Sequence, residues 1–245
     1  MPQAMKGVRE QPLLNPPVDG KKHSYEVAER DKAAMERSLT WWRDNKFHMC
    51  DEHLNQLYHM KLLGIQVKLT DEDERGVHEA LQKSMKPESA YKIPFIKHLL
   101  KLYERRAEIT PEERALIDGD LKRYSGHATI AEEITDHMRA LDFDYELTAR
   151  EKSSLAQSLN VARTYFERDG GHTHAETFLK TIILMKDFGI PYEADKKDRE
   201  LLEKSMNLFR QTSDYRLSIA YVCKMRMDER PEEKHAEQLP PLKKL

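Results

Sequence analysis

One stretch of the sequence occurs four times, and its clearest copy runs from Leu184 to Arg210. Each copy contains the end of an apolar helix, a short turn, and then a charged helix with an apolar residue at every third or fourth position. The other copies begin at His59, His98 and His137. Self-similarity at a spacing of about 40 residues is typical of helical arrays, in which each unit covers the apolar face of its neighbour. The repeat therefore predicts an all-α protein.

Two sets of equivalent residues mark the repeated unit. An apolar position near the end of each apolar helix is occupied by Met60, Leu99, Met138 and Met185. About ten residues later comes a side chain that is able to cap a helix N-terminus: Thr70, Thr110, Thr148 or Asp195. Such a side chain accepts a hydrogen bond from an N–H of the first helical turn, which has no partner inside the helix. These residues predict where the charged helices begin.

A fifth copy of the charged helix is expected from about Ser24 to Lys46, because the spacing Met35-x-x-Ser38-Leu39 recurs in the later copies. Each charged helix precedes a more apolar one, so we predict an α-solenoid of about five helix-turn-helix repeats over residues 24–228. Residues 1–23 and 229–245 lose the periodicity and contain several prolines. They are interpreted as irregular N-terminal and C-terminal tails.

The apolar helices are expected over residues 51–63, 89–105, 129–141, 172–188 and 214–226. Pro94 lies inside the second of them, so that helix either begins at Ile93 or is kinked there. A small or polar position beside the apolar interface holds Ser38, Ser84, Asp120, Ser158 and Ser205. A hydroxyl at this position is expected to bond to the carbonyl four residues back.

Three aromatic residues share a position three residues after the apolar column of the charged helices: Trp42, Tyr124 and Phe209. They are interpreted as core residues. Trp41 lies off this apolar stripe, and it is a candidate anchor for a partner.

Composition excludes several classes of protein. The formal net charge is −2, with both signs spread along the chain, so no overall field attracts nucleic acid or an anionic membrane. No apolar run approaches the roughly 20 residues of a membrane helix, and the first residues have no apolar core of a secretory signal. Cys50 and Cys223 lie in helical patterns, which favours buried thiols over a disulfide framework.

A basic or histidine residue recurs seven positions before the Leu/Met column of the charged helices: Lys32, His78, Arg114, Lys152 and Arg199. Stacked repeats would arrange these residues as a ladder along one side of the solenoid. Such a basic ladder suits a single strand of RNA or an acidic protein surface. It also suits plain solvation, with the methylene groups lying on a neighbouring helix.

Sequence motifs for catalysis are absent. The chain has no Gly-rich phosphate loop, no G-x-S-x-G, no H-E-x-x-H and no C-x-x-C pair. Three histidines stand one turn from a carboxylate, in the pairs Glu74 and His78, Glu133 and His137, and His172 and Glu176. These pairs belong to different repeats, and the column of His59, His98 and His137 continues with Leu184, which indicates packing. Cys50 near His48 and His53 shows no further catalytic partner. We expect no catalytic residue, no metal site and no cofactor.

The turn sequences LYHMKLLGIQ at Leu57 and TIILMKDFGIPYEAD at Thr181 resemble the close of a pentatricopeptide repeat. In that family a second helix ends in a Met-Lys-x-x-Gly-Ile segment before a short linker. A weaker copy surrounds His137 and lacks the glycine, and the copy at Leu99 has Tyr103-Glu104 in its place. The resemblance covers about residues 31–228. Equivalent columns lie 36 to 47 residues apart, so the chain is similar to a degenerate form of the repeat.

The resemblance implies an organelle, chiefly the mitochondrion, and either of two functions. One is a non-catalytic scaffold or adaptor subunit of a large assembly, such as a mitochondrial ribosome or a respiratory or ATP-synthase complex. The other is binding of single-stranded RNA, one base per repeat. Acidic clusters at the starts of the charged helices, Asp71 to Glu74 and Glu112-Glu113, would repel a phosphate backbone. We therefore favour the scaffold, with other protein subunits as partners.

Overall fold

The computed structural model describes residues 25–229 except 49, 125–127, 144–145 and 213, and it describes only the backbone of residues 128–132. The described residues form ten α-helices, a 3₁₀ turn (η1, Ala90–Lys92) and no strand, which confirms the all-α class. The predicted tail 1–23, and residues 230–245 of the tail 229–245, lie outside this range. The helices are α1 Glu29–Asp44, α2 Asp51–Leu62, α3 Asp71–Ser84, α4 Ile93–Leu102, α5 Pro111–Arg123, α6 Ala128–Ala140, α7 Ala149–Asp169, α8 His172–Asp187, α9 Lys196–Thr212 and α10 Arg216–Asp228.

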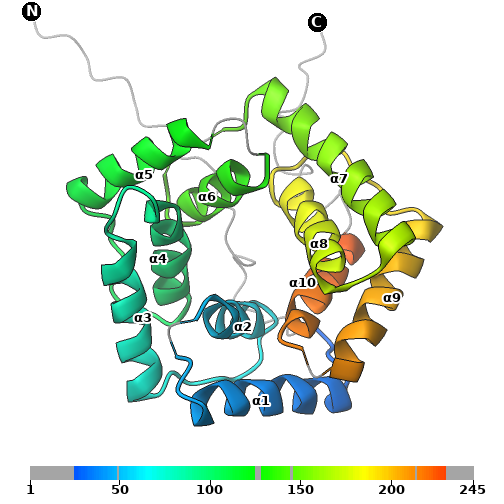
Figure 1. The fold of residues 1–245 in the computed structure, drawn as a ribbon, viewed down its shortest axis with the longest axis horizontal. Coiled ribbons are helices and arrows are strands. Elements are labelled where there is room, and N and C mark those ends of the chain that lie inside the picture. The colour runs from blue at the N-terminus through cyan, green and yellow to red at the C-terminus, as the bar shows by residue number, and fades with distance from the viewer. Residues whose placement is uncertain (1–24, 49, 125–127, 144–145, 213, 230–245) are drawn as a thin grey trace, which may run out of the picture.

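The helical hairpins form a closed ring, whereas the sequence led us to expect an open row. The even-numbered helices line the inside, and each packs against the next from α2 to α10. Helix α10 then packs against α2 and α1 (Figure 1). The odd-numbered helices lie outside and follow one another end to end around the perimeter. The first and last hairpins therefore cover each other's apolar faces.

Ring closure uses polar contacts as well as apolar ones. The Tyr221 hydroxyl donates to Asp31 Oδ2 at 2.7 Å, and Arg210 donates to the same carboxylate at 2.8 and 2.9 Å. Tyr25 donates to Asp228 at 2.9 Å. These contacts join α1, and the segment that precedes it, to α9 and α10. They therefore hold together the two ends of the described chain.

The four predicted N-caps are confirmed. The side chains of Thr70, Thr110 and Thr148 each accept from the backbone N–H three residues later, and the acid at that position bonds back to the cap N–H. Asp195 and Asp198 make the same reciprocal pair. Each of these caps satisfies an N–H that has no partner inside the helix.

The first helix differs from the prediction, because it spans Glu29–Asp44 and not 24–46. Ser24, where the sequence predicts that this helix begins with the serine as its N-cap, lies outside the described residues. Residues 25–28 are not helical, and Ala28 occupies the N-cap position without a side-chain bond. This start places Asp31 at the third helical position, where it meets Arg210 and Tyr221. The start of α1 thus coincides with the closure contacts of the ring.

Proline and the turns follow local rules. Helix α4 begins at Ile93 with Pro94 in its first turn, so the first alternative is confirmed and no kink is needed. A residue of positive φ lies two positions after the end of each of four inner helices: Gly64, Glu104, Asp142 and Gly189. The following N–H bonds back to a carbonyl five residues earlier, as from Ile65 to Met60 and from Ile190 to Met185. Two of these turns thus form without glycine.

The apolar column forms the centre of the core. Met60, Leu99 and Met138 are fully buried and Met185 is nearly so. Ser84 and Ser205 donate to the carbonyls four residues back at 2.8 Å, as predicted. For Ser38 the prediction was wrong, because its hydroxyl donates to Gln56 Oε1 on α2 at 3.2 Å. Of the three aromatic residues expected in the core, Phe209 is fully buried, while Trp42 and Tyr124 are half-buried.

Candidate functional site

Four of the five positions of the predicted basic ladder lie in the first turns of outer helices, namely Lys32, Arg114, Lys152 and Arg199, whereas His78 lies in the middle of α3. The five residues are therefore spread around the perimeter of the ring and do not follow one groove. Arg114 pairs with Asp118 at 3.0 Å and Arg199 with Asp228 at 3.1 Å. His78 Nδ1 bonds to the carbonyl of Glu74, Lys152 is exposed, and Lys32 is half-buried. Three of the five residues are thus engaged within the chain.

Trp41 is the predicted anchor, and 53% of its surface is exposed. Its ring stacks on that of Phe47, which is 45% exposed, with centroids 5.9 Å apart and planes inclined by 25°. Trp42 lies edge-on to Trp41 at 4.8 Å and joins this pair to the core. The sequence pattern pointed to Trp41 but not to Phe47, which lies beyond the end of α1.

Val161 and Tyr165 form a second exposed apolar pair, one turn apart on α7. The Tyr165 ring stacks on His174 at 5.5 Å and lies 4.8 Å from the Arg168 guanidinium. Neighbouring polar groups therefore cover part of this pair.

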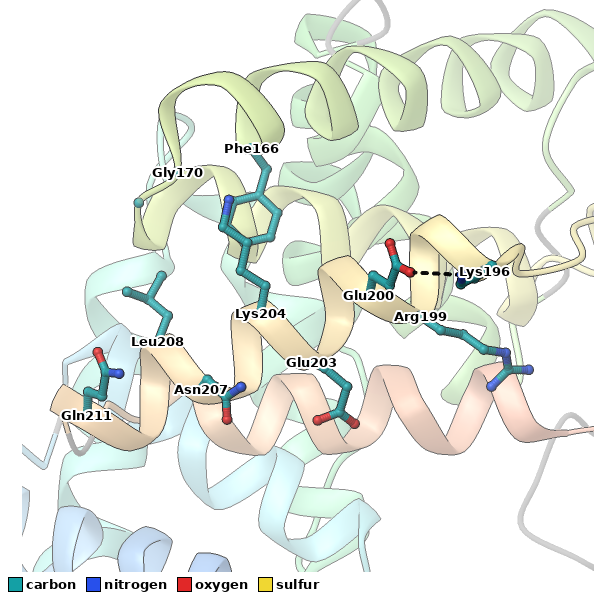
Figure 2. Close-up of a pocket in the computed structure, with 11 residues that line it drawn as sticks. Phe166, Gly170, Lys196, Arg199, Glu200, Glu203, Lys204, Asn207, Leu208 and Gln211 are labelled. Carbon is teal, nitrogen blue, oxygen red and sulfur yellow. Dashed lines mark ion pairs between the residues drawn. The ribbon is translucent and has the colours of Figure 1, made fainter.

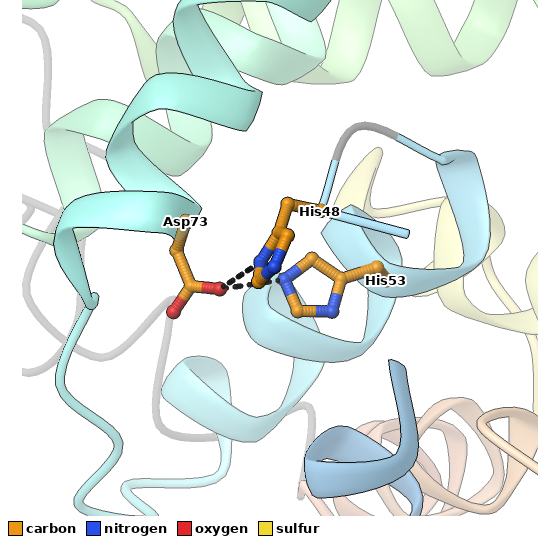
Figure 3. Close-up of side chains that lie close together, drawn as sticks. All are labelled: His48, His53 and Asp73. Atoms are coloured by element: carbon orange, nitrogen blue, oxygen red, sulfur yellow. Dashed lines mark hydrogen bonds and ion pairs between the residues drawn. The ribbon is translucent and has the colours of Figure 1, made fainter. Parts of the chain in front are cut away.

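Asp73 is a buried hub between the first two hairpins (Figure 3). His48 Nδ1 and His53 Nε2 lie 3.1 and 3.0 Å from the same oxygen, Asp73 Oδ1. Arg43 holds the other oxygen, and the Thr70 N–H also donates there at 2.9 Å. Burial by itself would raise the pKa of Asp73, but hydrogen bonds from His53 and Arg43 hold it well below its ordinary value.

These three side chains are the one group in the described part of the chain whose metal-ligand atoms all lie within 4.8 Å of one another. A carboxylate can only accept, so the two ring nitrogens that face it carry protons and direct no lone pair toward an ion. The Arg43 guanidinium on the same carboxylate also opposes a cation. We interpret the group as a hydrogen-bond hub. Cys50, noted beside it in the sequence, caps α2, and burial raises the pKa of its thiol to about 11.

The other candidate pairs have different partners in the structure. Glu74 pairs with Arg105 at 2.6 Å, and His172 pairs with Asp214 at 2.9 Å. Glu176 binds Arg216. None of these pairs converges with a third ligand atom among the described residues.

A groove of about 1090 Å³ crosses the outer surface where α7 ends beside α9. Figure 2 shows that its visible side chains come mainly from α9, with Lys196 paired to Glu200. The Lys204 ammonium lies 4.9 Å from the Phe166 ring. Acidic and basic groups both line the groove, so no charge of one sign collects there.

The inside of the ring contains a cavity of about 490 Å³, here called the axial cavity. The predicted histidine column meets beside it. His59 and His98 are buried, and His137 Nδ1 lies 3.1 Å from His98 Nδ1. Burial lowers the pKa of His59 to about 3 and that of His98 to about 4, and it lowers the pKa of His137 well below its ordinary value. The three imidazoles are therefore neutral at pH 7.

Carboxylates occupy the α6 and α8 side of the axial cavity. Glu133 and Glu176 share the ammonium of Lys180, at 3.5 and 3.2 Å. Asp187 pairs with Arg226 at 2.8 Å. The repeated histidine column was the one sequence signal of this cavity. The sequence did not show that the histidines and carboxylates meet there, because the helix faces that carry them turn inward only when the ring closes.

Comparison with protein-family models, with curated proteins and with solved structures finds no match to this chain. No described helix has both the length and the apolar character needed to cross a membrane.

Proposed function

We propose that this protein is a non-catalytic helical-repeat scaffold, an adaptor subunit of a larger protein assembly. In this proposal its five hairpins are copies of one degenerate pentatricopeptide-like unit, and its setting is the mitochondrion, as the sequence resemblance implies. The exposed stack of Trp41 on Phe47 carries the proposal.

Two large aromatic side chains that pack on each other in solvent gain full burial only against a partner. Tryptophan is the residue type most often found as an energetic anchor in protein interfaces. The stack is also rigid, because Trp42 backs it and joins it to the core. A pre-ordered anchor loses little side-chain entropy on binding. The ring therefore supplies a stable platform with an aromatic pair at one corner.

The test compares the full chain with Trp41→Ala/Phe47→Ala in its native cells, with Val161→Ala/Tyr165→Ala as a matched control on another helix. In sedimentation of a gentle lysate, the wild type and the control should travel with a larger assembly. The aromatic double variant should shift to the fractions of the free chain, because loss of two anchors costs about 2 kcal/mol or more of binding energy.

Nuclease treatment separates the protein scaffold from an RNA-binding protein. The scaffold stays in the heavy fractions after digestion of RNA. Release of the wild-type chain by ribonuclease, or unchanged sedimentation of the Trp41→Ala/Phe47→Ala variant, would count against the proposal.

A further inference from the structure

The axial cavity plays no part in the proposed scaffold function, yet it has the dimensions of a ligand site. Its volume of about 490 Å³ lies within the range of about 300 to 1,000 Å³ found for small-molecule pockets. Side chains from all five inner helices, from α3 and η1, and from Tyr215 line it. The exposed Asp51 and Lys83 are among them, and they mark where the cavity reaches the surface.

One wall of the axial cavity is aromatic. Tyr58, Phe95 and His137 meet edge to face or tilted, with centroids 5.3 to 5.5 Å apart. His59, only 7% exposed, lines the same space, and its Nδ1 has no hydrogen-bond partner. Because both imidazoles are neutral, they do not repel a cation, and His59 has a nitrogen left to bond.

The α6 and α8 side of the cavity contains one carboxylate without an ion pair among the described residues. Asp136 lines the cavity, and it forms no hydrogen bond or ion pair with any residue that the structure describes. Its acidic neighbours Glu133, Glu176 and Asp187 each have a basic partner. Burial, and next the negative charge of Asp187, raise the pKa of Asp136 to about 8. Arg226 and Arg139 offset part of this rise, but neither forms an ion pair with Asp136 in the described part of the chain. A cation in the cavity would therefore be the direct charged partner of Asp136.

We propose that the axial cavity binds a small organic cation whose ammonium group pairs with Asp136 and whose carbon skeleton lies against Tyr58 and Phe95. A carboxylate together with aromatic faces is the chemistry that recognises ammonium compounds. A carboxylate and aromatic rings in one cavity favour an amphipathic amine over a bare metal ion, which would require several free ligand atoms at one point.

The proposal predicts a linkage between binding and pH. The charged and titratable groups that face Asp136 are Asp187 from α8, Arg226 from α10, Tyr58 from α2, and Glu133 and Arg139 from its own helix. At pH 6.5 Asp136 is mostly protonated and cannot pair with a cation. At pH 8.5 it is mostly ionised, so the affinity for a permanently charged ligand should rise by about tenfold or more between these values.

The experiment is calorimetric titration of the full chain with benzyltrimethylammonium, whose charge is independent of pH, and with benzylamine. We expect binding at pH 8.5 that weakens by about tenfold or more at pH 6.5. Asp136→Asn should lose at least tenfold in affinity at pH 8.5. Glu200→Gln, which removes an exposed carboxylate on the outer surface, should bind as the wild type does.

Asp136→Asn keeps a neutral side chain of the same shape, so its thermal melting at pH 7 should match that of the wild type. Proton release provides a second measurement that needs no variant. Titration of the wild type at pH 7 in two buffers of different ionisation enthalpy should show release of nearly one proton per ligand.

Three results would overturn the proposal. They are absence of binding by the folded wild type at pH 8.5, equal affinity in the wild type and Asp136→Asn, and binding without proton release. Binding of MgCl₂ or ZnCl₂ that depends on Asp136, with no binding of either organic cation, would assign the cavity to a metal ion and would also overturn it.

Discussion

Gly76 and Gly119 both lie inside outer helices, but their surroundings are opposite. A Cβ atom on Gly76 would come within 2.6 to 2.7 Å of the backbone oxygen and carbon of His48, whereas one on Gly119 would meet nothing within 4 Å. Gly76 therefore lets α3 approach the loop that carries His48 to Asp73. At Gly119 no close contact requires a glycine, and the residue weakens its helix.

We expect Gly76→Ala and Gly119→Ala to change stability in opposite directions. The first should lower the free energy of unfolding by about 1 to 3 kcal/mol, because backbone atoms have to move apart. The second should raise it by up to about 1 kcal/mol through helix propensity. Urea unfolding followed by circular dichroism measures both. Equal effects of the two substitutions would mean that the close approach to His48 does not constrain the fold.

Asp73 shows at the scale of elements how one side chain joins four segments. As the third residue of α3 it completes the capping box, and it also binds Arg43 of α1, His48 of the connecting loop and His53 of α2. The same helical position holds a buried acid in three other outer helices: Asp31, Glu113 and Asp198. Each has a basic partner from another helix. The capping residue is therefore also a joint between hairpins.

The pH dependence of stability should reveal this role of Asp73. Its pKa in the folded chain lies below the unfolded value of about 3.9, so its contribution is fully present above that pH and is lost as the pH falls below it. Asp73→Asn should cost about 3 kcal/mol or more at pH 7, because buried donors lose a charged partner, and clearly less at pH 2.5. Urea midpoints at the two pH values test this.

Asp44→Asn is the control for this experiment, since Asp44 is exposed on α1. Its effect on the urea midpoint should be small at both pH values. A cost of Asp73→Asn that is the same at pH 7 and pH 2.5 would contradict the assigned linkage.

The ring is closed by an Arg–Asp ion pair of the same kind that joins neighbouring outer helices elsewhere in the molecule. Arg43, Arg163 and Arg210 each stand four residues after the Leu/Met column of an outer helix, and each pairs with the acid in the first turn of the next one: Asp73, Asp198 and Asp31. For Arg210 the next helix is α1, at the other end of the described chain. The contact between the last and the first hairpin is thus of the same kind as the contacts between successive hairpins.

Arg210→Ala and Arg163→Ala should therefore destabilise the protein by similar amounts, about 3 kcal/mol each, because each leaves a buried carboxylate without its cation. Unfolding should stay a single transition in both variants, since the loss in a closed ring is shared by all hairpins. Lys196→Ala, at an exposed pair, should cost less than about 1 kcal/mol. Fraying of α9 and α10 alone in Arg210→Ala would indicate an open array.

Much of the fold could be predicted because the governing rules are local. The period of the apolar residues, the caps at Thr70, Thr110, Thr148 and Asp195, and the position of Pro94 depend on neighbours within a few residues. The predicted start of α1 was wrong. The observed start coincides with the closure contacts of Asp31, and no residue nearby in the sequence signals those contacts. Phe47 was missed because it follows the end of a helix and belongs to no repeated column.

The sequence by itself determined that this chain forms helical hairpins of one kind, and where most of them begin. Only the tertiary structure decided that five such hairpins close into a ring. Closure depends on small rotations between hairpins that add up along the array and are not encoded in any one repeat. It brought His59 and His137, two members of the repeated histidine column, to the wall of a cavity that Asp136 also lines.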